Sequence, residues 1–382
     1  MSDGLDRVRA ALTARDAAGL RRVLQPRAAD DGMLDLASND YLGLSHDPRV
    51  TAAAADAACE WGAGSTGSRL VTGTTALHAE LEAELAEFCR APAALVFSSG
   101  YLANVGVLSM LGGRSVTIVS DAANHASLID GCRLSRSPVR VVPHRDVESA
   151  EAALATAETP DRLVVTDGVF SVDGDLAPLA ELHDVARAYG ALLVVDEAHA
   201  VGVIGAEGRG AVEAAGLADE PDVIRTVVLS KSLGAQGGAV VAAPDVVELL
   251  LNSARPFIFD TGLAPTAAGA ALTALRVLRA EPWRALAARA NAAALADIVC
   301  GLGVETVVPD AAVVPAVLGD PRRAVAAAAQ CLDGGVRVGC FRPPAVPPGR
   351  SCVRLTARAT LTSDDLTRAA GVLAEALRSS GD

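Results

Sequence analysis

The sequence predicts an α/β fold in which a mainly parallel seven-stranded sheet lies between helices, with a smaller C-terminal α+β domain. Between about residues 94 and 242, seven short apolar runs alternate with helix-length segments. Most of these runs are apolar on both faces, which is typical of parallel strands buried between two helix layers. With 382 residues and 51% hydrophobic content, the chain can also bury a large core.

The segment before this region, residues 1–45, is predicted to be an arm that packs on a larger body. A polar, partly helical stretch runs from Leu5 to Leu24. The extended LDLASNDYLGL follows, and the whole segment carries too little apolar surface to form a core of its own. We therefore place the large domain at residues 46–282.

The strands of the large domain are predicted, in chain order, at ALVFSS, SVTIVSD, VRVVPH, RLVVTD, ALLVVDE, VIRTVVLS and GAVVAA. Only about eight residues separate the last two runs, fewer than the dozen or more that a parallel crossover needs. The last strand should therefore run antiparallel to its neighbour. Residues 283–382 form the predicted small domain, with strands at AVVPAVLG and CVRLTA and a final helix.

Composition and charge argue against several classes of protein. The formal net charge of −13 disfavours a nucleic-acid partner. The seven cysteines are odd in number and lack CxxC spacing, which indicates neither a disulfide framework nor a metal site. No apolar stretch reaches the roughly 18 residues of a membrane helix, and the N-terminus has no signal-peptide pattern. We expect a cytoplasmic protein without a membrane partner.

Two predicted strands end in ionisable residues at an edge where an α/β sheet exposes them. Asp196 and His199 follow ALLVV, and Lys231 follows VVLS. Pyridoxal 5′-phosphate (PLP) needs a lysine amine to form an imine with its aldehyde, and a carboxylate to keep its pyridine nitrogen protonated. Lys231 and Asp196 fit these needs. The alternative for Lys231 taken alone is a surface lysine in a Gly-rich turn.

Three more features follow predicted strands. In FSSGYLAN, Ser99, Gly100 and Tyr101 lead into an apolar helix whose first backbone N–H groups suit a phosphate. His125 in NHASLIDG could stack on a pyridine ring or, alternatively, cap a helix. Ser171 follows RLVVTD. Together with Asp196 and Lys231, these features favour one PLP site over a set of accidental matches.

Seven motifs occur in the order seen in α-oxoamine synthases, and this resemblance covers nearly the whole chain. The family consists of PLP-dependent acyltransferases with PLP fold type I, so the resemblance implies that fold and that cofactor. Thr261 in FDTGLAP resembles a hydroxyl that the partner subunit donates to the phosphate, which implies a homodimer with shared active sites. The motifs are NDYLGL, GSTGSRLVTGTTALHAELE, FSSGYLAN, NHASLIDG, GVFSVDGDLAPL, VDEAHAVGVIG and LSKSLG.

The resemblance implies a role for each cofactor residue. Lys231 holds the cofactor as a Schiff base and then acts as the general base that removes the substrate α-proton, while Asp196 pairs with the pyridine nitrogen. His125 stacks on the ring and faces the substrate. The implied catalytic set is Lys231, His125, Asp196 and His199. The other implied cofactor contacts are Ser99, Gly100, Tyr101 and Thr261 for the phosphate, and Ser171 and His199 near the phenolic oxygen.

The resemblance also implies substrate contacts. Arg354 in CVRLTA resembles the arginine that clamps the amino acid carboxylate, with Asn39 nearby. Arg21 in GLRRV resembles the arginine that meets the acyl substrate's carboxylate, although it could instead be a solvated residue on a helix face. FRPPAVPPG, residues 341–349, looks most like the biotin-pathway branch. That branch condenses L-alanine with pimeloyl-CoA or pimeloyl-ACP and releases CO2 and thiol.

Two positions depart from the family pattern. Val228 stands three residues before the lysine, where relatives often have a threonine that contacts phosphate, so one phosphate donor is missing. Ala345 stands where the biotin branch usually has threonine, which bears on the acyl substrate.

Other functions remain as alternatives. A sister branch that uses glycine or serine, or a catalytically silent PLP-fold dimer subunit, would carry much of the same pattern. GAGSTG, residues 62–67, matches a dinucleotide motif but follows a helical stretch instead of a strand. Residues 196–199 spell a helicase box, yet the chain has no phosphate loop, and no GxSxG motif of a hydrolase occurs.

Overall fold

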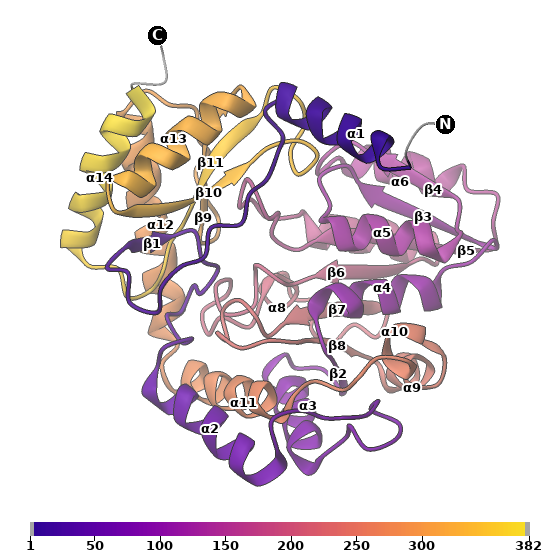
Figure 1. The fold of residues 1–382 in the computed structure, drawn as a ribbon. Coiled ribbons are helices and arrows are strands. Elements are labelled where there is room, and N and C mark those ends of the chain that lie inside the picture. The colour runs from indigo at the N-terminus through magenta and orange to yellow at the C-terminus, as the bar shows by residue number, and fades with distance from the viewer. Residues whose placement is uncertain (1–3, 379–382) are drawn as a thin grey trace.

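All seven predicted runs of the large domain form strands of a single seven-stranded sheet (Figure 1). The structure is a computed structural model that describes residues 4–378. The fold class is confirmed, because six of the strands run in one direction and helices cover both faces. In spatial order the strands are β2 (Ala93–Phe97), β8 (Gly238–Ala242), β7 (Val223–Val228), β6 (Leu192–Asp196), β5 (Asp161–Asp167), β3 (Val116–Asp121) and β4 (Val139–Val142).

The last strand of this sheet runs antiparallel, as the short connection before it predicts. β8 pairs antiparallel with both β2 and β7, so β2 and β7 point the same way. Its connection from β7 is a tight turn in which the Leu229 N–H donates to the Gly237 carbonyl at 3.0 Å. The insertion of β8 therefore leaves the carboxyl ends of the six other strands at one edge.

The apolar side chains of each strand point alternately to the two faces of the sheet and pack into separate hydrophobic cores there. In β6, Val194 packs into one cluster of buried residues, whereas Leu193 and Val195 pack into the cluster on the opposite face. One face is covered by α4 (Gly100–Leu111), α5 (Ala126–Ser135), α9 (Pro244–Ser253) and α10 (Arg255–Ile258). The other is covered by α3 (Ala76–Phe88), α6 (Val147–Ala155), α7 (Leu179–Ala188) and α11 (Pro265–Ala280), with α2 (Pro48–Trp61) against α11.

A second sheet of four strands lies beside the first and contains two strands that the sequence motifs did not predict. Residues 336–341 form one of them, and the extended arm contributes the other, which pairs with it in parallel. The order is β1 (Leu34–Leu36), β10 (Val336–Phe341), β11 (Ser351–Thr356) and β9 (Val313–Gly319). The helices of this part are α12 (Trp283–Gly301), α13 (Pro321–Asp333) and α14 (Ser363–Arg378), while α8 (Ala211–Ala214) belongs to the large sheet's connections.

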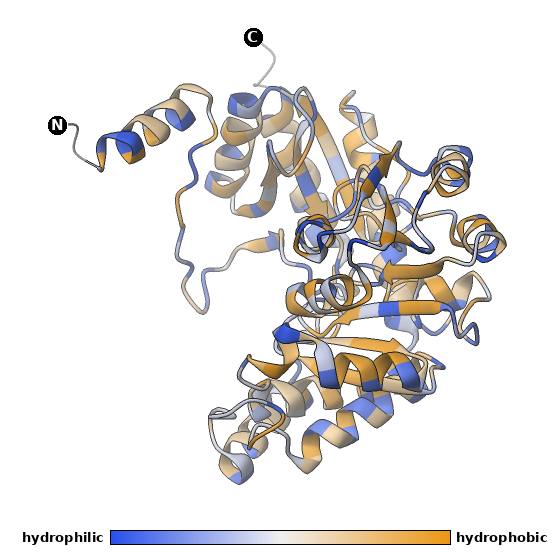
Figure 2. Ribbon diagram, turned by 90° about the vertical axis from the view of Figure 1, so that its right-hand side faces the viewer, coloured by the Kyte–Doolittle hydropathy of each residue, from blue (hydrophilic) through white to orange (hydrophobic). Residues whose placement is uncertain are grey.

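The first helix, α1 (Asp6–Ala17), stands apart from both sheets. It buries none of its residues, and Figure 2 shows it projecting away from the rest of the chain. The linker after it is tied down by Arg342, whose Nη1 donates to the Gly19 carbonyl at 2.6 Å. No helix within residues 4–378 has the length and apolar content needed to cross a bilayer.

The boundaries proposed above for the arm, the large domain and the small domain stay a prediction. The pairing of β1 with β10 shows that residues 34–36 of the arm are part of the small sheet.

Candidate functional site

The carboxyl edge of the large sheet gathers the ionisable residues that follow its strands. Asp121, Asp167 and Asp196 are the last residues of β3, β5 and β6, and Lys231 lies three residues after the end of β7. Asp167 and Asp196 are direct neighbours in the register of β5 and β6. Because the strands are parallel, these side chains share one edge of the sheet, where ligands of open α/β sheets bind.

The Asp196 carboxylate is buried and held by hydrogen bonds. The Asn104 amide donates to one oxygen at 2.7 Å, and the Ala198 N–H donates to the other at 2.9 Å. Thr226 in turn donates to the Asn104 carbonyl oxygen at 2.6 Å, which fixes the amide orientation. Three elements thus orient one anion at the edge of the sheet.

Lys231 is the only lysine in the chain. Its side chain is half-buried and forms no hydrogen bond or ion pair with residues 4–378. Burial lowers the pKa of Lys231, the Arg354 charge adds to this effect, and the carboxylates of Asp196 and Asp167 oppose it. A partly desolvated amine without a fixed partner is suited to covalent chemistry or to proton transfer.

The turn that carries Lys231 depends on glycine. The Gly234 N–H donates to the Lys231 carbonyl at 2.9 Å, and Gly234 has a φ of 60°. A Cβ at Gly234 would clash with the backbone nitrogen of Ser45. The segment after NDYLGL therefore packs directly on the lysine turn, which explains why two motifs far apart in the sequence both contribute to the site.

His125 both caps a helix and belongs to the charged cluster, so the two interpretations of this residue are compatible. Its Nδ1 accepts from the Ser127 N–H at 3.3 Å at the start of α5. Burial lowers the pKa of His125, and the Lys231 charge lowers it further, whereas Asp196 raises it. Its backbone N–H donates to Asp167 at 3.4 Å. Burial and the neighbouring Asp196 raise the pKa of Asp167, one of whose oxygens has no partner among the described residues.

His199 is held by Tyr41 from the NDYLGL motif. The Tyr41 hydroxyl lies 2.5 Å from His199 Nδ1, and both side chains are buried. Burial lowers the pKa of His199 well below its usual range, and the charges of Lys231 and Arg354 act in the same direction. The imidazole is therefore neutral, and its second nitrogen can serve as a neutral hydrogen-bonding group.

Arg354 reaches this cluster from β11 of the small sheet. One guanidinium nitrogen donates to the Ser171 carbonyl at 2.7 Å, and another donates to the Asn39 side chain at 2.8 Å. The guanidinium also lies 4.3 Å from the centre of the Phe341 ring. Its Nε is buried without a partner among the described residues. The predicted association of Arg354 with Asn39 is thus present, and Ser171 adjoins them.

The start of α4 forms a close-packed backbone surface at the end of β2. The Ser99 hydroxyl caps the helix by accepting from the Leu102 N–H at 3.2 Å. A Cβ at Gly100 would clash with Cγ1 of Val228, so only glycine fits there. The Tyr101 side chain points elsewhere, because it is exposed and its hydroxyl donates to Asp130 at 2.6 Å.

Two predicted site residues lie outside this cluster in the single chain. Arg21 is exposed and forms an ion pair with Asp16 at 2.6 Å. Thr261 is exposed in a bridge with Ser68. Their roles in substrate and cofactor binding stay predictions.

The sequence arguments missed three residues of the site: Asn104, Tyr41 and Asp167. Asn104 had a usable signal, because it is a polar residue inside an otherwise apolar helix and follows Gly100 by about one helical turn. Tyr41 lies inside the NDYLGL motif and Asp167 directly before GVFSVDGDLAPL. The spacing of residues along the chain does not identify the partners of either side chain.

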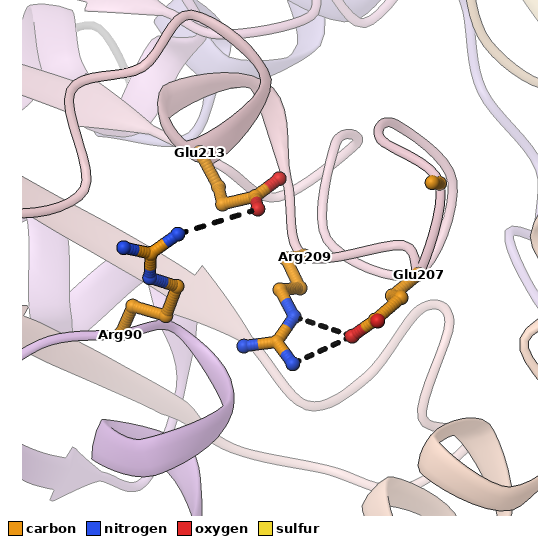
Figure 3. A pocket seen from close by; sticks show the side chains of 5 residues that line it. Arg90, Glu207, Arg209 and Glu213 are labelled. Carbon is orange, nitrogen blue, oxygen red and sulfur yellow. Dashed lines mark hydrogen bonds and ion pairs between the residues drawn. The ribbon is translucent and has the colours of Figure 1, made fainter.

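A surface pocket of about 460 Å³ lies apart from this cluster (Figure 3). It is lined by Ala206 and four charged residues, and Figure 3 shows ion pairs of Arg90 with Glu213 and of Arg209 with Glu207. None of the predicted site residues lines it.

The dinucleotide alternative fails on context. GAGSTG follows α2 and lies in a loop, so no strand precedes it.

Comparisons with known proteins agree with this arrangement. A family model described as aminotransferase class I and II matches residues 31–373. The 8-amino-7-oxononanoate synthases of Mycobacterium sp. strain KMS and of Mycobacterium bovis are 58% and 57% identical to the chain over 363 residues. These matches cover 95% of the chain and 94% and 93% of the relatives.

Solved structures give the same picture. Serine palmitoyltransferase from Sphingomonas wittichii has a TM-score of 0.91 at 32% identity, with 100% of the chain and 99% of that structure covered. A serine palmitoyltransferase solved with PLP has a TM-score of 0.90 at 32% identity and full coverage of both chains. The 8-amino-7-oxononanoate synthase from Francisella tularensis has a TM-score of 0.78 at 26% identity, covering 92% of the chain and 99% of that structure.

Proposed function

The chain belongs to the class I and II aminotransferase family, and we propose that it is the PLP-dependent acyltransferase that makes 8-amino-7-oxononanoate for biotin biosynthesis. The substrates are L-alanine and a pimeloyl thioester, and the other products are CO2 and free thiol. The observation that carries this proposal is the 57–58% identity to enzymes of that name over 95% of the chain.

The residues at the sheet edge fit PLP. Lys231 offers an amine that forms no hydrogen bond or ion pair with residues 4–378. Asp196 offers a buried carboxylate that hydrogen bonds from Asn104 and Ala198 hold in place. Gly100 provides a backbone surface with no room for a side chain, at the first turn of α4, where N–H groups favour a phosphate. His125 and His199 would face the ring. Matched donors and acceptors thus exist for the aldehyde, the pyridine nitrogen and the phosphate.

When bound, PLP supplies an electron sink that stabilises a carbanion at the amino acid α-carbon. The chain's own groups hold and move the protons. Lys231 Nζ, with its lowered pKa, takes the α-proton and later returns it. Asp196 would pair with the ring nitrogen of the cofactor, and neutral His199 would offer it a hydrogen bond without adding a competing positive charge.

The amino acid carboxylate is assigned to Arg354. Its Nε is buried and has no partner within the described part of the chain, and the Ser171 and Asn39 contacts hold the planar guanidinium in place. For the acyl carboxylate we assign Arg21, which extends from the linker that Arg342 of the FRPPAVPPG segment holds. Ala345 in that segment bears on acyl selection.

A homodimer with shared active sites completes the proposal. Thr261 is exposed and forms a bridge with Ser68, and the two loops joined by this bridge carry two strongly exposed apolar residues, Val71 (78%) and Phe259 (69%). The two loops lie together, since the Gly262 N–H donates to the Gly67 carbonyl at 3.0 Å. An exposed apolar patch of this kind is typical of an interface between subunits.

A second candidate is a serine-using acyltransferase, because the serine palmitoyltransferase structures have higher TM-scores than the Francisella tularensis synthase. Backbone similarity reports the shared fold, whereas substrate choice lies in side chains. The much higher sequence identity to the mycobacterial enzymes therefore favours alanine and pimeloyl substrates.

A thiol-release assay tests the function directly. Purified PLP-loaded protein is supplied with alanine, glycine or serine, each combined with pimeloyl-CoA, pimeloyl-ACP or palmitoyl-CoA. We expect the highest kcat/KM for alanine with a pimeloyl donor. A preference for serine with palmitoyl-CoA would move the chain to the sister branch, and the absence of release with every pair would indicate a silent subunit.

A further inference from the structure

His144 joins two carboxylates that belong to different strand connections. It lies in the loop after β4, with Nδ1 3.1 Å from Asp121 and Nε2 2.9 Å from Asp175. Asp121 ends β3, and Asp175 lies in the connection after β5. The ring also meets the Phe170 ring edge-on, with centroids 4.3 Å apart. Both ring nitrogens are therefore engaged, and the imidazole also packs against an aromatic ring.

Asp175 and Phe170 belong to a tight hairpin, residues 168–177, that leads from β5 to α7. Val169 and Leu176 form its antiparallel bridge, and the Phe170 N–H donates to the Asp175 carbonyl at 3.0 Å. A Cβ at Gly174 would lie 2.6 Å from the Val313 carbonyl, so the tip presses against β9 of the small sheet. The hairpin therefore spans the gap between the two sheets.

The same hairpin also contacts Arg354, the arginine of the candidate site. The Ser171 carbonyl accepts from Arg354 at 2.7 Å, and the Asp173 carboxylate pairs with Arg350 at 3.2 Å. His144 contacts Asp175 and Phe170, which flank Ser171 and Asp173 in the sequence. His144 and Arg354 thus contact the same backbone segment, so the loss of the His144 contacts can shift the carbonyl that holds Arg354.

We propose that His144 is a positioning residue that anchors hairpin 168–177 and thereby holds Arg354 ready for the amino acid carboxylate. This inference rests on the proposed function for the role of Arg354 and for the identity of the amino acid. His144 makes no direct contact with the residues assigned to the cofactor, and the hairpin meets Arg354 through the backbone carbonyl of Ser171. We therefore expect the main effect on amino acid binding.

The charges around His144 favour its protonated form. Burial lowers its pKa, but the hydrogen bonds to Asp121 and Asp175 outweigh burial and raise the pKa of His144 to about 9. Arg145 is the other cation beside this group, donating to Asp175 at 3.1 Å and through its backbone N–H to Asp121 at 2.7 Å. Two cations balance two carboxylates. Because the folded-state pKa is raised, the anchor is complete below the ordinary pKa of about 6.5 and is lost as the pH rises through about 9.

The test compares His144→Gln and Asp175→Asn with the wild type, and all three proteins are loaded with PLP. Near neutral pH, we expect each variant to raise KM for L-alanine about tenfold while kcat changes about twofold or less, because ground-state positioning is lost without loss of the reacting groups. The ratio of the KM of His144→Gln to that of the wild type should fall towards one above pH 9, where wild-type His144 is itself neutral. Titrations of the substrate and of Lys231 cancel in this ratio.

His183→Gln is the matched control, since His183 is another buried histidine paired with a carboxylate, Asp222 at 3.0 Å. Asp222 precedes β7, so this pair lies at the opposite edge of the sheet. We expect an unchanged KM for alanine in that variant. An unchanged KM in both His144→Gln and Asp175→Asn, or a constant variant-to-wild-type ratio across pH, would overturn the proposal.

The same variants separate this proposal from the proposed function. If the wild type releases no thiol from pimeloyl donors, amino acid affinity is measured instead by the change in visible cofactor absorbance for whichever amino acid the wild type binds. The dissociation constant of that amino acid should still rise about tenfold in His144→Gln. If His144→Gln fails to fold, as judged by its thermal unfolding midpoint, Asp175→Asn alone decides between the two outcomes.

Discussion

At the scale of single residues, the site depends on how burial sets the charge of each group. Desolvation lowers the pKa values of Lys231, His125 and His199, so the amine moves towards its free-base form and the imidazoles stay neutral. The Asp196 side chain lies among them and accepts hydrogen bonds from the Asn104 amide and from a backbone N–H.

Replacement of Lys231 tests the covalent role of its amine. Lys231→Ala should abolish both the visible absorbance of the PLP-loaded protein and turnover. Lys231→Arg is the matched control for charge, and it should lose the same absorbance because a guanidinium does not form the imine. Since the chain has no other lysine, borohydride reduction and peptide mapping should label only this side chain. A labelled site elsewhere would contradict the assignment.

Val228 offers a gain-of-affinity test. Its Cγ1 faces the position where Gly100 would carry a Cβ, so a hydroxyl in place of that methyl would face the first turn of α4. Val228→Thr should tighten PLP binding about fivefold, corresponding to one added hydrogen bond of about 1 kcal/mol. Val228→Ala serves as the control for lost volume. Equilibrium titration gives the PLP dissociation constants, and an equal or weaker affinity in Val228→Thr would refute the missing-donor interpretation.

At the scale of elements, parallel strands explain why residues that are distant in sequence meet. The last residues of five parallel strands lie at one edge of the sheet; these strands are β2, β3, β5, β6 and β7. The antiparallel β8 pairs with β2 and β7, and the short turn that joins it to β7 replaces a crossover connection. The start of α4 then packs against the end of β7 so closely that Gly100 has no room for a Cβ beside Val228. The proposed phosphate end of the site is therefore formed by packing between two elements.

Gly100→Ala should disrupt this junction. The new Cβ would clash with Val228 Cγ1, so the first turn of α4 must shift away from β7. We expect the PLP dissociation constant to rise by about tenfold or more and the thermal unfolding midpoint to fall, as overpacking costs about 1–3 kcal/mol. The double variant Gly100→Ala with Val228→Ala should recover much of both values. Gly371→Ala in α14, where a Cβ meets nothing within 4 Å, is the neutral control.

At the scale of the whole molecule, the site lies between the two sheets. The large sheet contributes Lys231 and Asp196, and the small sheet contributes Arg354. Hairpin 168–177 and the NDYLGL segment connect the sheets at this point through Ser171, Tyr41 and Asn39. In the proposed function, amino acid binding therefore requires the two sheets to hold one relative position.

The proposed dimer gives a prediction at the same scale. Val71→Glu combined with Phe259→Glu should place two charges in the exposed apolar patch beside Thr261 and convert a dimer into a monomer. PLP affinity should fall by about tenfold or more with it, because the partner's phosphate contact is lost. Val308→Glu, at an 89% exposed apolar residue, should leave the dimer intact. Sedimentation velocity measures the state, and a variant that stays dimeric with unchanged PLP affinity would contradict a shared site at Thr261.

The sequence by itself determined the large sheet and the chemical type of the site. Apolar runs of strand length alternate with helical segments, a local pattern that specifies both the strands and their burial on two faces. The residues after those strands, Asp196, Lys231, His125 and Gly100, were identifiable because chain direction alone sends them to one edge. Even the antiparallel β8 followed from the length of a single turn.

Only the tertiary structure decided which side chains meet. Asn104 bonds to Asp196 across 92 positions, and Arg354 bonds to Asn39 across 315. β1 and β10 were also missed, because each is short and pairs with a strand far away in the chain. Contacts of this kind depend on the path of the whole backbone and on close packing between elements, whereas sequence patterns report only what neighbouring residues prefer.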